Sequence, residues 1–141
     1  MTCHEAREKV RAHLDRVGHK PVVLTEKIIR RWWNVLNVAV FYGKLPQPQR
    51  IKLHSARDHH AQVVCKNEHE AVWELEMAPE YVSRWLFLDV LVHEMVHAWE
   101  HMRHRVMGHG KRFVLWRKRI KRTVMLDLMK EISEADYVEE S

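Results

Sequence analysis

The segment SRWLFLDVLVHEMVHAWEHM, residues 83 to 102, narrows the possible folds of this chain more than any other. Apolar residues occur on almost every side of it at helical spacing, which predicts a helix from about Ser83 buried between a sheet and other helices. Asp89 and His93 interrupt it, so no apolar run is long enough to span a bilayer. Ionisable side chains in a buried helix need partners or a metal, because burying an unpaired charge is strongly unfavourable.

Two amphipathic helices are predicted before this segment. The first runs from Glu5 to Val17 and ends at Gly18, because its apolar residues recur at helical spacing up to that glycine. The second runs from Glu26 to about Tyr42, with Thr25 as its N-cap and Gly43 after it. The following GKLPQPQ segment is not expected to be helical, because it holds two prolines within three residues.

Three strands and one more helix complete an α+β order. The strand candidates are residues 50–54, 62–66 and 71–76, of which the first and third alternate apolar and polar residues. We expect Ala71 to Leu75 to be an edge strand beside the buried helix, where an extended peptide could add as a further strand. A last helix from Phe113 to about Ile132 is predicted from one apolar stripe: Phe113, Trp116, Ile120, Val124 and Leu128.

The composition is that of a globular protein, with 46% hydrophobic and 30% charged residues. A chain of 141 residues can form its own apolar core, so a single domain over residues 1–141 is expected. The start MTCHEAREKVR has no apolar leader, which favours a cytoplasmic location without a membrane. Cys3 and Cys65 form no CxxC pair, so neither a disulfide framework nor a cysteine zinc site is predicted. The oligomeric state is not indicated.

The net charge of +5 is unevenly distributed. KRFVLWRKRIKR, residues 111–122, has seven basic residues: Lys111, Arg112, Arg117, Lys118, Arg119, Lys121 and Arg122. Such a helix favours contact with a phosphate backbone, hence non-specific DNA, although a solvated helix face is the alternative. The acidic tail, about residues 133–141, is a candidate for disorder or for covering this basic helix.

The sequence HEMVH is an HExxH match that points to metal chemistry. His93 and His97 are four residues apart, so on a helix their imidazoles lie on one face and can bind one zinc ion. Glu94 is then placed to reach a water on that ion and to act as a general base. The alternative is a histidine and glutamate patch without a metal.

Three later histidines compete to be the third zinc ligand. His101 lies about 6 Å beyond His97 along a continuous helix axis, and His104 lies farther still, so both are poorly placed. His109 stands between two glycines, which allow a tight turn back over the helix, and is favoured. His101 and His104 stay open as ligands if the helix ends early. Otherwise they contact substrate at the rim or are plain surface histidines, and Asp89 is a candidate to orient an imidazole.

Residues 37 to 115 resemble the SprT-like family of zinc metallopeptidases, which includes the Spartan-type proteases of DNA–protein crosslink repair. The matching pieces are NVAVFYGKLPQPQRIKL, MAP, LVHEMVHAW and GHGKRF. The resemblance implies a zincin-like fold, in which a small three-stranded sheet packs on a buried HExxH helix with flanking helices. It implies that His93, His97 and His109 bind one Zn²⁺ and that Glu94 is catalytic.

The resulting hypothesis is a zinc-dependent endopeptidase that acts on peptides or on DNA-associated proteins. The chain departs from the family pattern in three ways. The loop between His97 and His109 is short, an expected glycine is missing from the SARDHHAQVV region, and the C-terminal zinc ribbon is missing because only two cysteines exist. These departures concern substrate preference more than the proposed ligands. The competing hypothesis is a nucleic-acid-binding or interaction module in which the zinc is structural or lost.

Overall fold

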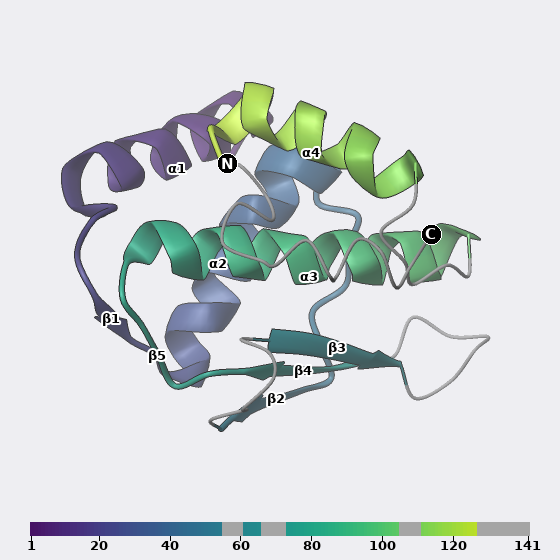
Figure 1. The fold of residues 1–141 in the computed structure, drawn as a ribbon. Helices are drawn as coiled ribbons and strands as arrows, with labels where there is room; N and C mark the ends of the chain where they lie inside the picture. Colours follow the sequence, from purple (N-terminus) through teal and green to yellow (C-terminus); the bar gives the residue numbers. More distant parts are fainter. Residues whose placement is uncertain (55–60, 66–72, 105–110, 127–141) are drawn as a thin grey trace.

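A computed structural model describes residues 1–54, 61–65, 73–104 and 111–126 of the chain (Figure 1). These residues form four helices and two small sheets, which confirms the predicted α+β class. The elements in chain order are α1 (Cys3–Val17), β1 (Val22–Val23), α2 (Glu26–Phe41), β2 (Arg50–Leu53), β3 (Ala61–Cys65), β4 (Trp73–Met77), β5 (Glu80–Tyr81), α3 (Arg84–His104) and α4 (Lys111–Val124).

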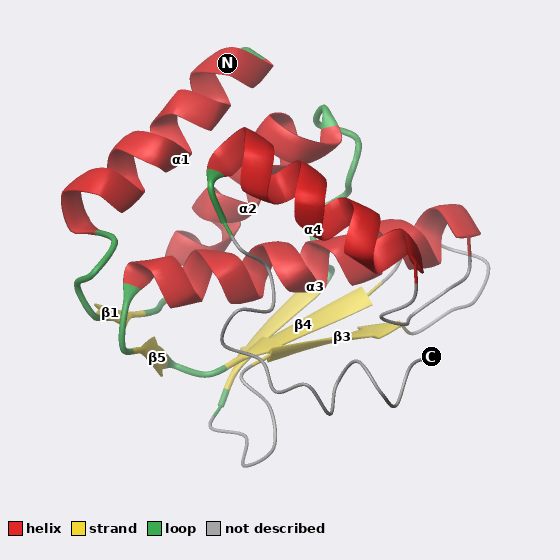
Figure 2. Cartoon of the chain, turned by 45° about the horizontal axis from the view of Figure 1, so that its top comes forward, coloured by secondary structure: helices red, strands yellow, loops and turns green. Residues whose placement is uncertain are grey.

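Helix α3 lies between the three-stranded sheet and α4 in both ribbon views (Figures 1 and 2). From Phe87 to Ala98 every residue of α3 is buried, so the sequence-based prediction of a helix covered on all sides is confirmed. Ser83 caps the helix through a hydrogen bond of 3.0 Å from the amide of Leu86 to its hydroxyl. In the described part of the chain, no helix is long and apolar enough to cross a membrane.

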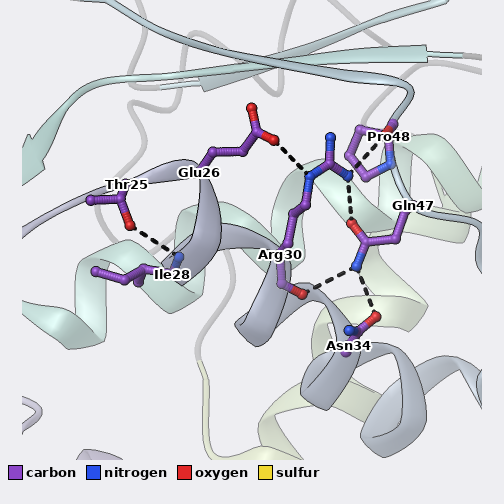
Figure 3. Close-up of polar contacts among 7 residues, drawn as sticks. All are labelled: Thr25, Glu26, Ile28, Arg30, Asn34, Gln47 and Pro48. Carbon is purple, nitrogen blue, oxygen red and sulfur yellow. Dashed lines mark hydrogen bonds and ion pairs between the residues drawn. The ribbon is translucent and has the colours of Figure 1, made fainter.

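Local capping explains where α1 and α2 begin. Thr2 and Glu5 form a capping box, in which each side chain accepts a hydrogen bond from the other residue's amide at 3.1 Å. Thr25 caps α2 as predicted, because its hydroxyl accepts from the amide of Ile28 at 3.2 Å (Figure 3). Both signals lie within one helical turn and are therefore readable from sequence.

The end of α2 reverses the chain through two left-handed residues. Tyr42 has a φ of 55° and Gly43 a φ of 75°, so the helix stops one residue earlier than predicted, at Phe41. The buried Asn37 then holds the next segment: its Nδ2 donates to the carbonyl of Leu45 at 2.7 Å, and the amide of Leu45 donates to its Oδ1 at 3.0 Å.

Polar contacts fasten the proline-containing segment to α2 (Figure 3). The Nη1 atom of Arg30 donates to Oε1 of Gln47 and to the carbonyl of Pro48, both at 3.1 Å. In return, Nε2 of Gln47 donates to the carbonyl of Arg30 at 3.1 Å and to Oδ1 of Asn34 at 2.7 Å. These contacts lead the chain directly from α2 into β2.

The three-stranded sheet has the order β2-β4-β3, with β2 parallel and β3 antiparallel to β4. Leu75 in β4 is in register with Ile51 on one side and Val63 on the other. The expectation that Ala71 to Leu75 forms an edge strand is therefore wrong. The strand there, β4, is central, and the edge next to α3 is β3. Strand order depends on pairing between distant segments, which alternation within one strand does not report.

Two further differences from the sequence-based expectations concern short or terminal segments. A two-residue pairing of Val22 and Val23 with Tyr81 and Glu80 joins the start of the chain to the segment before α3, and it was not predicted. Helix α4 ends at Val124 rather than near Ile132, because Met125 adopts a φ of 65°. Leu128 and the acidic tail lie outside the described residues.

Candidate metal centre

His93 and His97 occupy one face of α3 and are almost completely buried, with 4% and 8% of their surfaces exposed. Their Nε2 atoms are 3.0 Å apart. Ring nitrogens at this distance either share one proton or bind one cation, because two protonated nitrogens would repel each other. The four-residue spacing of the motif thus brings two nitrogen donors to one point, as the sequence predicted.

Glu94 reaches the same point from the next position of the helix. Its Oε2 lies 3.6 Å from Nε2 of His93, and its Oε1 accepts a hydrogen bond of 3.0 Å from the amide of Val63 in β3. Burial raises the pKa of the Glu94 carboxyl to about 8, and the hydrogen bond from Val63 opposes that rise. The edge strand therefore orients the carboxyl, a role that no signal in the sequence assigned to Val63.

Phe113, in the first turn of α4, packs against both histidine rings. Its ring centroid lies 4.8 Å from that of His93 and 5.2 Å from that of His97, and its side chain is 1% exposed. Phe113 is the phenylalanine of the GHGKRF piece, and it follows His109 by four residues in sequence. The first turn of α4 thus lies directly beside the paired imidazoles, which hydrophobic periodicity alone did not indicate.

The proposed third ligand, His109, lies outside the described residues, as does the side chain of His104. Within the described ranges, no group of three or more histidine, cysteine, aspartate or glutamate side chains is arranged to hold a metal. The described part of the centre consists of the two imidazoles and Glu94.

Asp89 and His101, the two other described candidates on α3, are both buried. Asp89, one turn before His93, is 3% exposed. His101, one turn after His97, is 7% exposed, and neither of its ring nitrogens has a hydrogen-bond partner among the described residues. The reading of His101 as a plain surface histidine is therefore wrong, because the last part of α3 is still covered. The helix was expected to be buried, but the covering of this later turn depends on packing between distant segments.

The seven basic residues of α4 do not share one environment. Lys111, Arg112, Lys118, Lys121 and Arg122 are exposed, whereas Arg117 and Arg119 are half-buried. Arg119 donates to the hydroxyl of Tyr42 at 3.0 Å, and its guanidinium lies 5.1 Å from the ring centre of Trp116. Arg112 lies 3.9 Å from the buried carboxyl of Glu100. Part of the basic helix therefore serves the packing of α4 on α2 and α3.

Comparison with known proteins identifies the family of the chain. No curated protein and no solved structure matches the chain significantly. The model of the SprT-like family matches residues 29–136, a span that begins in α2 and includes the sheet, α3 and α4. This span covers more than half of the chain and contains the residues on which the resemblance was first seen. The chain therefore belongs to the SprT-like family.

Proposed function

We propose that this chain is a zinc-dependent endopeptidase in which His93, His97 and His109 bind one Zn²⁺. The observation that carries the proposal is the 3.0 Å separation of the two Nε2 atoms beside Glu94. In a tetrahedral site with Zn–N distances near 2.0 Å, two ligand nitrogens lie about 3.3 Å apart, so a small adjustment of either ring accommodates the ion. Membership of the SprT-like family supports the same reading.

His109 completes the proposed site on sequence grounds. Two peptide bonds separate it from Lys111, the first residue of α4, whose first turn contacts both imidazoles through Phe113. His93, His97 and His109 would hold the ion, which would act there as a Lewis acid and lower the pKa of a water molecule towards about 7.

Glu94 is the proposed general base. The amide of Val63 fixes Oε1 of its carboxyl, which leaves Oε2 on the side of the histidine nitrogens to accept a proton from the attacking water. A divalent cation beside a carboxyl favours the charged form, so a filled site would lower the pKa that burial raises. Substrate main chain would lie along the edge strand β3, which replaces residues 71–75 as the proposed docking strand.

The decisive experiment compares Glu94→Gln with wild type, using one unfolded polypeptide such as casein as substrate. We expect Glu94→Gln to retain about one zinc per chain and to lose about 10²-fold to 10⁴-fold in cleavage rate, because only the proton acceptor is removed. Glu80→Gln, an exposed position in β5, is the matched control and should cleave at the wild-type rate. Equal cleavage by Glu94→Gln and wild type would refute the proposal, and bound zinc without wild-type cleavage would favour a binding module.

Non-specific nucleic-acid contact is a second proposal, which the exposed cations of α4 support. Lys118 and Arg122 are exposed one turn apart on this helix. If they contact phosphates, the double variant Lys118→Gln/Arg122→Gln should bind DNA of any sequence more weakly and with a salt dependence reduced by about two contacts. An unchanged salt dependence of binding, measured by fluorescence anisotropy, would reject this contact.

A further inference from the structure

A pocket lies between α1 and α2. Its volume is about 220 Å³, and its lining consists of Lys9, Ala12, His13, Arg16, Arg31 and Trp32. Arg84 at the start of α3 acts electrostatically on His13 in this pocket. His93 follows Arg84 by nine positions, which is about 14 Å along the helix axis. This pocket is therefore separate from the candidate metal centre.

The residues that line this pocket carry positive charge and no negative charge. Lys9, Arg16 and Arg31 are exposed cations, and no acidic residue is among its lining. Within the described ranges, none of the three makes an ion pair or a side-chain hydrogen bond. Like charges held together in this way repel one another, so an arrangement of this kind is unfavourable for folding alone.

Neighbouring arginines on the same two helices are engaged with protein groups. Arg7 donates to the carbonyl of Ala39 at 2.9 Å, Arg11 donates to the carbonyl of Thr123 at 2.7 Å, and Arg30 pairs with Glu26 at 3.1 Å. Partners are thus available to cations elsewhere on α1 and α2. The three cations of the pocket have no such partner among the described residues.

Arg84 adds a further positive charge near His13. Its Nε atom is buried and has no hydrogen-bond partner, and its guanidinium makes no ion pair with any described residue. It stands in the first turn of α3, where no acidic residue balances the positive end of the helix dipole. The pKa of His13 is lowered first by burial and then by the positive charges of Arg84, Arg16 and Arg31.

An aromatic wall accompanies the cations. The rings of His13 and Trp32 lie 4.5 Å apart between centroids, with 44° between their planes. Trp32 is 6% exposed, so the wall is held rigidly by the core behind it. Cations from α1 and α2 therefore line a pocket that also has the buried Trp32 ring in its wall.

We propose that this pocket binds the phosphate group of a small phosphorylated ligand. Arginine presents planar, paired N–H donors that match phosphate oxygens, and a phosphate offers three acceptor oxygens to donors that approach from different sides. Arg16 from α1 and Arg31 from α2 would contact the outer oxygens, and the buried Nε–H of Arg84 would gain an anion beside it. The proposal does not depend on the peptidase activity.

The test is a titration of the full chain with inorganic phosphate at constant ionic strength, followed by NMR of the arginine Nε–Hε groups. We expect a saturable shift of the Arg84 signal. The double variant Arg16→Gln/Arg31→Gln should bind at least about tenfold more weakly, because each lost charge-assisted hydrogen bond is worth that factor or more. The charge-matched control Lys44→Gln/Arg50→Gln should change the affinity less than about twofold, because these two exposed cations do not line the pocket and their charges are screened at that distance.

Three outcomes would overturn the proposal: a shift that does not saturate, an equal loss of affinity in both double variants, or acetate binding as tightly as phosphate. Adenosine monophosphate as a second probe identifies the source of the phosphate. Tighter binding than inorganic phosphate, with a shift of the Trp32 indole signal, supports the site and assigns it to a nucleotide. Equal affinities support the site and assign it to free phosphate.

Discussion

The beginning and the middle of α3 place ionisable side chains in opposite surroundings. In the middle, His93, His97 and Glu94 are buried, converge on one point and are oriented by β3 and by Phe113. At the beginning, Arg84 lies near the cations of α1 and α2, and no described acidic side chain pairs with it. The middle of α3 presents nitrogen and oxygen atoms suited to binding a cation. The region near its beginning presents cations suited to binding an anion.

The difference lies in what the surrounding elements contribute. The middle of α3 is enclosed on both sides, by the sheet and by α4, so its geometry is set by core packing and leaves little freedom (Figure 2). The pocket at the beginning is open, and its exposed arginines can adjust to a ligand. Polar arrangements that do not favour folding alone are a mark of functional positions. The following predictions test each region in turn.

The largest expected effect is loss of the metal. His97→Ala and His109→Ala should purify without zinc, because two remaining ligands do not hold the ion, whereas His101→Ala should retain about one zinc per chain. Metal analysis of the purified proteins measures this, with circular dichroism to check that each variant is folded. Zinc loss in His101→Ala would move the third ligand to the last turns of α3 and contradict the assignment of His109.

The next effect concerns the packing that positions the imidazoles. Phe113→Ala should lower the free energy of unfolding by about 3–5 kcal/mol, because it leaves a cavity against both histidine rings. Leu115→Ala, two residues on and 65% exposed, is the matched control and should stay within about 0.5 kcal/mol. Urea unfolding measures both. Similar losses in the two variants would mean that the start of α4 is not held on the metal centre.

A smaller effect of opposite sign is expected at His101. Its buried ring nitrogens have no partner in the part of the chain that the structure describes, so His101→Leu should raise the free energy of unfolding by about 1–2 kcal/mol without changing zinc content. Urea unfolding of the zinc-loaded proteins measures the change. A decrease in stability would show that the imidazole has a favourable interaction that the described residues do not supply.

The smallest effect is expected in the basic pocket. Arg31→Gln should raise the free energy of unfolding by about 0.3 kcal/mol at low salt, because it relieves repulsion among exposed cations, and the gain should vanish at about 1 M salt. Thermal unfolding at the two salt concentrations measures it. A loss of stability at low salt would indicate that an acidic group outside the described residues pairs with Arg31. The pocket would then not differ from the middle of α3 in lacking a partner charge.

Local signals account for what could be predicted from the sequence. The cap at Thr25, the glycine after Tyr42 and the all-round apolar pattern of α3 act within one or two helical turns, so α1, α2 and α3 were located to within about two residues, whereas the end of α4 was not. The HEMVH spacing likewise placed two imidazoles and a carboxyl together, because helix geometry relates residues one and four positions apart in the same way in any protein.

Contacts between distant segments account for the errors and omissions. The edge strand was assigned to the wrong segment, and the hydrogen bond from Val63 to Glu94 was not foreseen, because both depend on strand order. The internal roles of Arg112 and Arg119 and the burial of His101 were missed for the same reason. Periodicity reports which face of an element is apolar but not which element covers it.

By itself the sequence determined the α+β class, the membership of the SprT-like family and the paired histidines with their neighbouring glutamate, since these rest on short spacings and local periodicity. Only the tertiary structure decided that β3 orients Glu94, that Phe113 packs against both imidazoles, and that Arg16 of α1 and Arg31 of α2 line one pocket with His13. Residues far apart in the chain become neighbours only through packing of the core, and no local pattern specifies that arrangement.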